Sequence, residues 1–198
     1  MRIRRAGDRG LLVETGDPHR LHAAVRAAGL PGVLDVVPGE RTVLITTAGD
    51  PGRLAERLPG LPLPEQAAGD APPVQIPVVY DGADLAEVAE LTGLSPEEVV
   101  ARHTAAEYTV AYLGFSPGFG YLTGLPAELR VPRRDSPRTA VPAGAVAIAG
   151  PYAAVYPAPS PGGWRLLGRT DLALWDVTRD PPSLLRPGAR VRFVADAS

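Results

Sequence analysis

The residues best suited to chemistry lie between Gly114 and Thr170. This segment begins Gly-Phe-Ser-Pro-Gly-Phe-Gly-Tyr-Leu and ends Pro-Gly-Gly-Trp-Arg-Leu-Leu-Gly-Arg-Thr. It combines aromatic rings with guanidinium groups, which bind carboxylates and phosphates through paired hydrogen bonds. We therefore predict a stiff, aromatic-walled site for an anionic ligand. The candidate anion- and substrate-binding residues are Gly118, Phe119, Arg133, Gly144, Trp164 and Arg169, and the candidate catalytic residues are His103, Tyr121 and Arg138.

Each candidate also has a purely structural interpretation. Phe119 and Trp164 are residues that often fill a core, and an arginine in a loop is most often solvated or in a weak surface ion pair. The Tyr121 hydroxyl is suited to orienting a substrate. His103 has an ordinary pKa near neutrality and so could handle protons, although a histidine that only stabilises a helix end is commoner.

The elements that carry these residues must be short strands. Residues 114–170 contain nine prolines and nine glycines, which exclude a long helix. We expect strands near 74–80, 108–113, 145–148, 153–156, 164–168, 172–176 and 191–194. Many short strands between Gly and Pro corners favour a closed β-barrel or sandwich.

The first third of the chain predicts a different architecture. Helices are expected after Asp17-Pro18 and after Asp50-Pro51, where an N-cap aspartate precedes proline. Strands near 11–13, 33–37 and 42–46 complete a small α+β sandwich over residues 1–63. A Pro- and Gly-rich linker, 64–73, then leads to a mainly-β domain, 74–198.

Two short helices are expected early in the second domain. Asp84 is the predicted N-cap of the first, and Ser95-Pro96-Glu97-Glu98 predicts a capping box at the start of the second. The pair resembles a helix-turn-helix. Glutamates stand where base-contacting residues should be and the chain is acidic, so we expect no nucleic-acid partner.

Composition excludes several classes of function. The net charge is −2, no apolar run is long enough for a membrane helix, and no secretory signal is visible, so we expect a cytoplasmic protein. There is no cysteine, which excludes disulfides and thiol chemistry, and no lysine, which excludes a P-loop lysine. With only three histidines, we expect no metal site.

Ordered motifs across the second domain resemble one family. It is variously called the B subunit of 5-oxoprolinase, allophanate hydrolase subunit 1 and the sporulation-kinase inhibitor family. The matching pieces run from Glu98 to Phe193 and include His103 with Tyr108, Gly114–Leu122, Pro132-Arg133, Ser136-Pro137-Arg138, Val141–Gly144, Ile148–Gly150, Tyr156-Pro157, Pro161–Trp164 and Gly168–Thr170.

The resemblance implies a cyclophilin-like barrel and a role as one subunit of an enzyme. It implies an ATP-dependent 5-oxoprolinase that converts 5-oxo-L-proline to L-glutamate. ATP would be shared between this chain and two partners, a larger C subunit of related barrel fold and an A subunit. On this interpretation the chain is inactive alone. The alternatives are an inhibitor of a histidine kinase, and half of a biotin-dependent carboxyltransferase of the urea carboxylase type.

Three departures from the family pattern affect the site. Ala145 stands where the family commonly has serine, Gly120 stands where proline or alanine is usual, and Pro151–Ala154 replaces a polar run. The loss of a hydroxyl and an amide weakens polar contacts there. These departures bear on the substrate and not on the expected fold.

Overall fold

The computed structural model describes residues 1–65 and 71–196. It divides into two compact units, Met1–Asp70 and Ala71–Ser198, and each unit contains its own cluster of buried apolar side chains. Part of the predicted linker, residues 66–70, lies outside the described residues. Within the described part, every helix is too short or too polar to cross a membrane.

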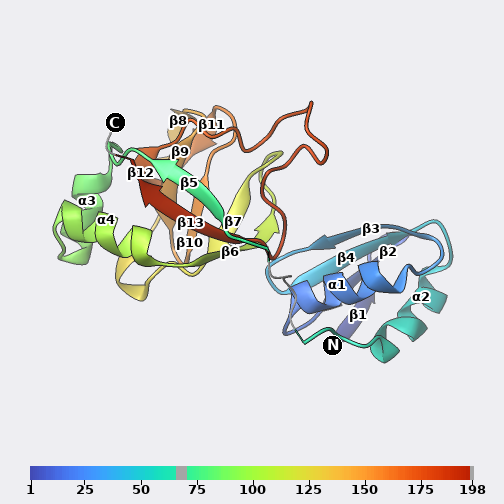
Figure 1. The fold of residues 1–198 in the computed structure, drawn as a ribbon. Coiled ribbons are helices and arrows are strands. Elements are labelled where there is room, and N and C mark those ends of the chain that lie inside the picture. Colours follow the sequence, from blue (N-terminus) through green and yellow to red (C-terminus); the bar gives the residue numbers. More distant parts are fainter. Residues whose placement is uncertain (66–70, 197–198) are drawn as a thin grey trace. The chain divides into compact units, whose positions relative to one another are not determined.

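The first unit is a four-stranded antiparallel sheet with two helices (Figure 1). The strand order is β1-β2-β4-β3, and the alternating residues of β2 and β4 point into a core that the helices cover. The elements in chain order are β1 (Arg2–Arg5), β2 (Gly10–Glu14), α1 (Pro18–Ala28), β3 (Val33–Pro38), β4 (Thr42–Thr47), α2 (Pro51–Arg57) and a 3-10 turn, η1 (Leu58–Gly60).

The ends of α1 follow from local chemistry as the sequence predicts. The Asp17 carboxylate accepts a hydrogen bond from the Arg20 N–H at 3.0 Å, and Pro18 occupies the first turn. Gly29 ends the helix with φ 52°, a left-handed conformation that glycine adopts without penalty. Leu21 and Val25 are then both buried against the sheet.

The second unit is a mainly antiparallel barrel of seven strands with two helices. Its sheet has the order β12-β9-β10-β7-β6-β13-β5, and a separate pair, β8 and β11, lies outside it. The elements in chain order are β5 (Val74–Val78), α3 (Leu85–Thr92), α4 (Pro96–Ala105), β6 (Tyr108–Leu113), β7 (Gly120–Thr123), η2 (Ala127–Leu129), β8 (Arg138–Val141), β9 (Ala145–Ala149), β10 (Tyr152–Val155), β11 (Ser160–Gly162), β12 (Arg165–Arg169) and β13 (Arg190–Ala195).

The two edge strands of this sheet join to close the barrel. Val79, just after β5, and Arg169, at the end of β12, exchange two backbone hydrogen bonds of 2.9 Å. The join needs a residue without a side chain, because a Cβ on Gly168 would lie 2.3 Å from the Val79 carbonyl oxygen. Closure removes the free sheet edges that would otherwise pair with other chains.

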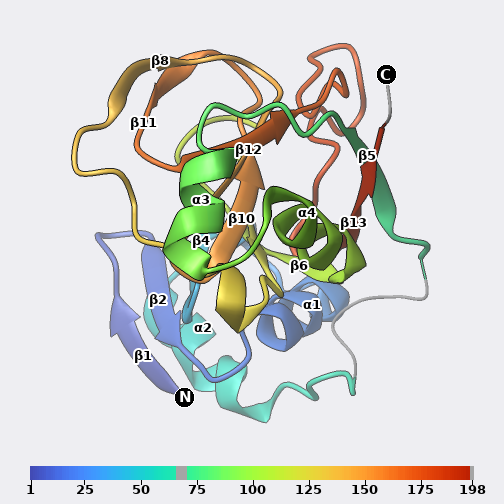
Figure 2. The same cartoon turned by 90° about the vertical axis from the view of Figure 1, so that its left-hand side faces the viewer.

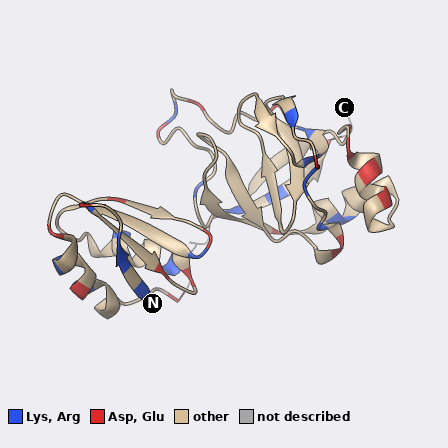
Figure 3. Cartoon of the chain, turned by 180° about the vertical axis from the view of Figure 1, so that it is seen from behind, with Lys and Arg blue, Asp and Glu red and all other residues tan. Residues whose placement is uncertain are grey.

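Helices α3 and α4 lie side by side against the barrel (Figure 2). The predicted capping box is confirmed: the Ser95 N–H donates to the Glu98 carboxylate at 2.8 Å and the Glu98 N–H to Ser95 Oγ at 3.2 Å. These helices carry several acidic residues (Figure 3), including Glu87, Glu97 and Glu98.

One sequence prediction in this unit is confirmed only in position and another is wrong. Asp84 occupies the N-cap position of α3 as predicted, but its side chain makes no capping hydrogen bond. It forms hydrogen bonds with arginines from another part of the barrel instead. The predicted strand at 172–176 is absent from the sheet, and residues 174–184 form a narrow loop with a single antiparallel bridge, Trp175 to Ser183.

Candidate functional site

The Gly114–Leu122 motif contains the β6–β7 connection and the start of β7, and its glycines and proline shape a tight turn. The Phe119 N–H donates to the Ser116 oxygen at 3.0 Å, and the Gly114 N–H to the Phe119 oxygen at 3.1 Å. Gly118 has φ 81°, and a Cβ there would lie 2.9 Å from the Cβ of Trp175. Gly118 therefore serves the turn and its packing, with no side chain to offer a ligand.

The turn places Phe119 at the centre of an aromatic cluster. Its ring makes edge-to-face contacts with Tyr121, Tyr156 and Trp164, with centroids 5.1, 5.3 and 5.7 Å away. These rings come from β7, from the residue after β10 and from the residue before β12. Phe119 and Trp164 are buried, whereas Tyr121 is only partly covered. Edge-to-face packing holds such rings in one arrangement.

A small pocket of about 140 Å³ opens beside this cluster. The guanidinium of Arg133 lies 5.9 Å from the centre of the Trp164 ring and is the one cation among the described residues on the pocket wall. The lining residues are Phe115, Phe119, Tyr121, Arg133, Tyr156, Gly162, Gly163 and Trp164.

Glycine is required on the floor of the pocket. A Cβ on Gly162 would lie 2.3 Å from the Tyr156 hydroxyl, so any side chain would displace the tyrosine. Burial raises the pKa of Tyr156, and the Trp164 backbone N–H and the positive charge of Arg133 act in the opposite direction. The hydroxyl stays protonated at neutral pH and is available as a hydrogen-bond donor or acceptor.

The loop that carries Arg133 is held by contacts on both sides. The Arg134 N–H donates to the Gly163 oxygen at 2.8 Å, and Arg165 Nε donates to the Pro132 oxygen at 3.3 Å. Arg165 also pairs with Glu87 on α3. These contacts within the chain hold the loop in place, and the loop holds Arg133 over the Trp164 ring.

A buried carboxylate organises the neighbouring arginines. Asp84, whose side chain is 2% exposed, accepts hydrogen bonds from Arg134 Nη1 at 2.8 Å, from Arg138 Nη2 at 2.7 Å and from the Leu166 N–H at 2.7 Å. Burial by itself raises the pKa of Asp84, but the hydrogen bonds from Arg138 and Leu166 and the two positive charges outweigh it and hold the pKa below its ordinary value.

Four predicted site residues meet in the pocket: Phe119, Tyr121, Arg133 and Trp164. Arg138 is not among the residues that line it, because its guanidinium is bound to Asp84. Gly144 has φ 79°, and a Cβ there would lie 2.1 Å from the Thr170 oxygen, so this glycine serves close backbone packing.

Arg169 is separated from the pocket. Its Nε donates to Asp81 at 2.8 Å in a pair that is about half exposed on each side. It lines another hollow, of about 430 Å³, beside Val79, Thr170 and Leu172. The expectation that Arg133 and Arg169 grip one ligand therefore does not agree with the structure.

The placement of His103 corrects the proposed catalytic role. Its side chain is fully buried, shares a 2.7 Å hydrogen bond between Nδ1 and the Tyr80 hydroxyl, and packs on the rings of Tyr108 and Phe193. Burial lowers its pKa to about 3. A neutral imidazole enclosed in the core does not line the pocket, which favours the structural interpretation of His103.

Five residues of this region were not among the predicted site residues: Asp84, Phe115, Tyr156, Gly162 and Gly163. Asp84 was missed because its position before a helix indicates an N-cap. Tyr156 and Gly162 were missed because their spacing from Phe119 along the chain does not reveal the packing. Only the pairing of β8 with β11 and of β10 with β7 brings these segments together.

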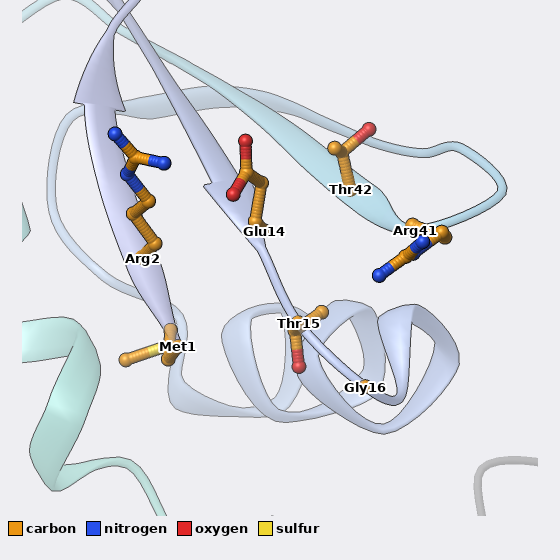
Figure 4. A pocket seen from close by; sticks show the side chains of 7 residues that line it. All are labelled: Met1, Arg2, Glu14, Thr15, Gly16, Arg41 and Thr42. Atoms are coloured by element: carbon orange, nitrogen blue, oxygen red, sulfur yellow. The ribbon is translucent and has the colours of Figure 1, made fainter.

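A larger hollow, of about 870 Å³, lies in the first unit (Figure 4). Arg2 and Arg41 stand at its rim, and Glu14 is paired with Arg4 at 2.8 Å. Few apolar groups line it, and the residues that the structure describes there aim no buried polar group into it. It is a shallow surface between strand ends, and we do not assign it a ligand.

The fold and the pocket define a class of protein. The second unit is a closed β-barrel module that presents a small aromatic pocket with an arginine at its wall. Such a pocket suits a small, flat ligand that carries a carboxylate, because the rings contact its faces and the guanidinium pairs with its charge.

Comparison with known proteins identifies the family. The family model for the carboxyltransferase domain, subdomain C and D, matches residues 1–185, and the chain belongs to this family. It is 44% identical to the B subunit of 5-oxoprolinase from Escherichia coli O157:H7 over 178 residues, which cover 86% of this chain and 82% of that protein.

Other relatives are longer than the matched region. The protein named as the B subunit of 5-oxoprolinase in Bacillus subtilis (strain 168) is 52% identical over 61% of this chain and 52% of its own length. The crystal structure of TTHA0988 superposes with a TM-score of 0.85 at 44% identity, over 96% of this chain and 41% of that one. The chain thus spans about two fifths of that solved protein.

Proposed function

We propose that this chain is a subunit of a 5-oxoprolinase complex and contributes a substrate pocket to a site completed by partner subunits. The observation that carries the proposal is the 44% identity to a protein of that name over 86% of the chain. The pocket supports it, because 5-oxo-L-proline is a small flat lactam with one carboxylate. Arg133 would hold the carboxylate and the rings of Phe119 and Trp164 would contact the lactam.

The residues of the pocket do not by themselves fit ATP. A hollow of about 140 Å³ with one guanidinium on its wall cannot hold a triphosphate. We propose that ATP binds largely on the partners, the C and A subunits of the complex, and that this chain alone is inactive. Its own contribution is to orient the lactam, to exclude water with its aromatic wall and to neutralise a carboxylate.

The fold proposed for the second unit is the cyclophilin-like barrel, and the proposed location is the cytoplasm. The closed seven-stranded sheet supports the first. The second remains a prediction from the sequence. Of the other functions that the resemblance implies, inhibition of a histidine kinase has no supporting observation among the described residues.

A carboxyltransferase role with biotin has one supporting observation. The matching family model is described as a carboxyltransferase domain. Under this alternative the pocket would accept the carboxylated biotin ring or its acceptor. Loss of product when avidin sequesters biotin would favour it, whereas glutamate formation that is indifferent to avidin would favour 5-oxoprolinase.

The test is reconstitution with purified subunits. We expect ATP-dependent glutamate formation from 5-oxo-L-proline only when this chain and both the C and A subunits are present. Equal glutamate formation by the two partners without this chain would contradict the proposal.

Arg133→Gln tests the pocket within the same assay. Loss of a charge-assisted contact to the carboxylate should raise KM by about tenfold or more, with a smaller effect on kcat. The matched control is Arg53→Gln, an exposed arginine on α2, which should change neither. An unchanged KM in Arg133→Gln would place the substrate carboxylate elsewhere.

A further inference from the structure

Four arginines lie in or beside the segments that frame the pocket, and three of them are held by acidic side chains. Arg134 and Arg138 donate to the same atom, Oδ1 of Asp84, at 2.8 and 2.7 Å. The Asp84 side chain is buried, so this pairing lies away from water. Each arginine keeps a buried donor without a partner among the described residues, Arg134 Nε and Arg138 Nη1. Asp84 therefore balances their charge without using all of their donors.

The other two arginines differ from each other in their partners. Arg165 is mostly buried and pairs with Glu87. Arg133 lies over the Trp164 ring on the pocket wall, is exposed, and forms no ion pair with an acidic side chain among the described residues. The pocket therefore presents one guanidinium charge that no carboxylate in the described part of the chain neutralises.

The arginines that Asp84 balances are close enough to act on the pocket wall. Burial raises the pKa of Tyr156, a lining residue, and the positive charges of Arg133 and Arg138 both oppose this rise. Arg134 follows Arg133 in the chain, and its N–H donates to the oxygen of Gly163, another lining residue, at 2.8 Å. At short range and away from water, opposite charges cancel and like charges add. The number of unbalanced guanidinium groups therefore sets the charge that the pocket offers to a ligand.

We propose that Asp84 determines the charge class of the ligand: by balancing Arg134 and Arg138 it leaves one positive charge at the pocket, which selects a small cyclic monocarboxylate over a dicarboxylate. Asp84 does not line the pocket, so it acts through the arginines as a specificity-determining residue. The inference rests on the proposed function and deepens it. The lactam 5-oxo-L-proline carries one carboxylate, whereas ring opening to L-glutamate creates a second, for which the pocket has no unbalanced guanidinium.

Loss of the Asp84 charge should change which anions bind. Two guanidinium groups with spare donors would then stand beside the pocket without a counter-charge. Guanidinium groups bind carboxylates through paired hydrogen bonds, so a second carboxylate on the ligand would gain a partner. Specificity is a difference between two affinities, and this change raises the affinity for the dianion relative to that for the monoanion.

Two acids built on the same ring measure this preference. Cyclopentanecarboxylate carries one negative charge at mildly alkaline pH, and the vicinal dicarboxylate of the same ring carries two. Binding is measured by titration calorimetry on the full chain, and as competitive inhibition of glutamate formation in the reconstituted complex. The wild type should bind the monocarboxylate at least about tenfold more tightly than the dicarboxylate, and Asp84→Asn should lower this ratio by about tenfold or more.

Further variants separate charge selection from a loss of structure. Asp84→Asn combined with Arg138→Gln removes one charge of each sign and should return the ratio toward the wild-type value, whereas purely structural damage would not be reversed. Glu87→Gln removes a carboxylate that is 44% exposed, should shift the ratio in the same direction by a smaller factor, and tests the inference if Asp84→Asn does not fold. The matched control is Asp81→Asn, which removes the partner of Arg169 outside the pocket and should keep the wild-type ratio.

The outcomes distinguish this inference from the proposed function. A wild-type ratio in folded Asp84→Asn or, where that variant does not fold, in Glu87→Gln would overturn the inference. So would an equal shift in Asp81→Asn, or a wild-type chain that binds neither acid either alone or with the C and A subunits. A wild-type complex that binds the acids with the expected ratio but forms no glutamate would contradict the proposed function and leave the role of Asp84 in charge selection intact.

Discussion

Single residues set the electrostatics of the second unit, and Asp84 is the clearest case. One buried carboxylate accepts hydrogen bonds from two guanidinium groups and from a backbone N–H of β12. It links the start of α3 to the loop that carries Arg133 and to β8. Removing its charge would leave two arginines facing each other, which costs more than the loss of one hydrogen bond.

Asp84→Asn should therefore lower the free energy of unfolding by about 3 kcal/mol. The pKa of Asp84 is below its unfolded value, so its contribution is present above the unfolded pKa and is lost as pH falls through the folded pKa. The wild-type advantage over Asp84→Asn should shrink in acid. Urea denaturation of both proteins measures it.

The control for Asp84 is the exposed pair between Asp81 and Arg169. Both side chains are about half exposed, so Asp81→Asn should change stability by less than about 1 kcal/mol. Equal effects of the two substitutions would show that the Asp84 network is no stronger than a surface ion pair.

His103 should make folding sensitive to mild acid. Its folded pKa of about 3 lies below the unfolded value of 6.5. Below pH 6.5, His103 therefore binds a proton in the unfolded chain but not in the folded chain. Stability should fall by about 1.4 kcal/mol per pH unit as pH decreases from 6.5 toward 3.

Comparing how stability depends on pH in the wild type and in a variant without His103 isolates the contribution of this histidine. The double variant His103→Leu, Tyr80→Phe removes the imidazole together with its hydrogen-bond partner. It should lose most of the slope between about pH 6.5 and about pH 4.5, measured by urea denaturation at each pH. An unchanged slope would mean that other groups cause it.

At the scale of elements, the closure of the barrel depends on close backbone contact. β5 and β12 meet through Val79 and Arg169, and Gly168 lies against the Val79 carbonyl. The β12–β9 ladder also shifts register between Leu166 and Gly168, so the strand bends where it reaches this join. A side chain at Gly168 would force the two strands apart.

Gly168→Ala should destabilise the second unit by at least about 2 kcal/mol, because the added methyl overlaps backbone that cannot move without opening the join. The matched control is Gly114→Ala, where the nearest atom to an added Cβ is 3.6 Å away on the Tyr121 ring, an ordinary contact. Thermal melts of both variants and of the wild type measure the difference in stability. A Gly168→Ala melt equal to that of the wild type would show that the join tolerates a side chain.

At the scale of the molecule, the chain contains separate apolar cores. One is built from α1, α2 and the four-stranded sheet, and the others lie in and around the barrel. Each unit satisfies its own backbone hydrogen bonds through its own sheets. A unit with its own core is expected to fold alone.

A fragment of residues 71–198 should therefore fold cooperatively. We expect a single melting transition, near-ultraviolet circular dichroism from Trp164 and Trp175, and Tyr108 buried as in the whole chain. The fragment of residues 1–65, which contains the core of the first unit, should likewise fold alone. A fragment 71–198 that lacks tertiary signals would show that the barrel needs the first unit to fold.

Local chemistry in the sequence determined the ends of α1 and α4, most of the strands and the aromatic and arginine content of the site, because caps, breakers and alternation act over a few residues. It also determined the family, since many ordered motifs are matched. Only the tertiary structure decided which arginine reaches the pocket, that Asp84 binds arginines instead of capping α3, and that His103 is enclosed. Those outcomes depend on contacts between residues about 50 to 90 positions apart, which the register of the closed sheet sets and local sequence does not encode.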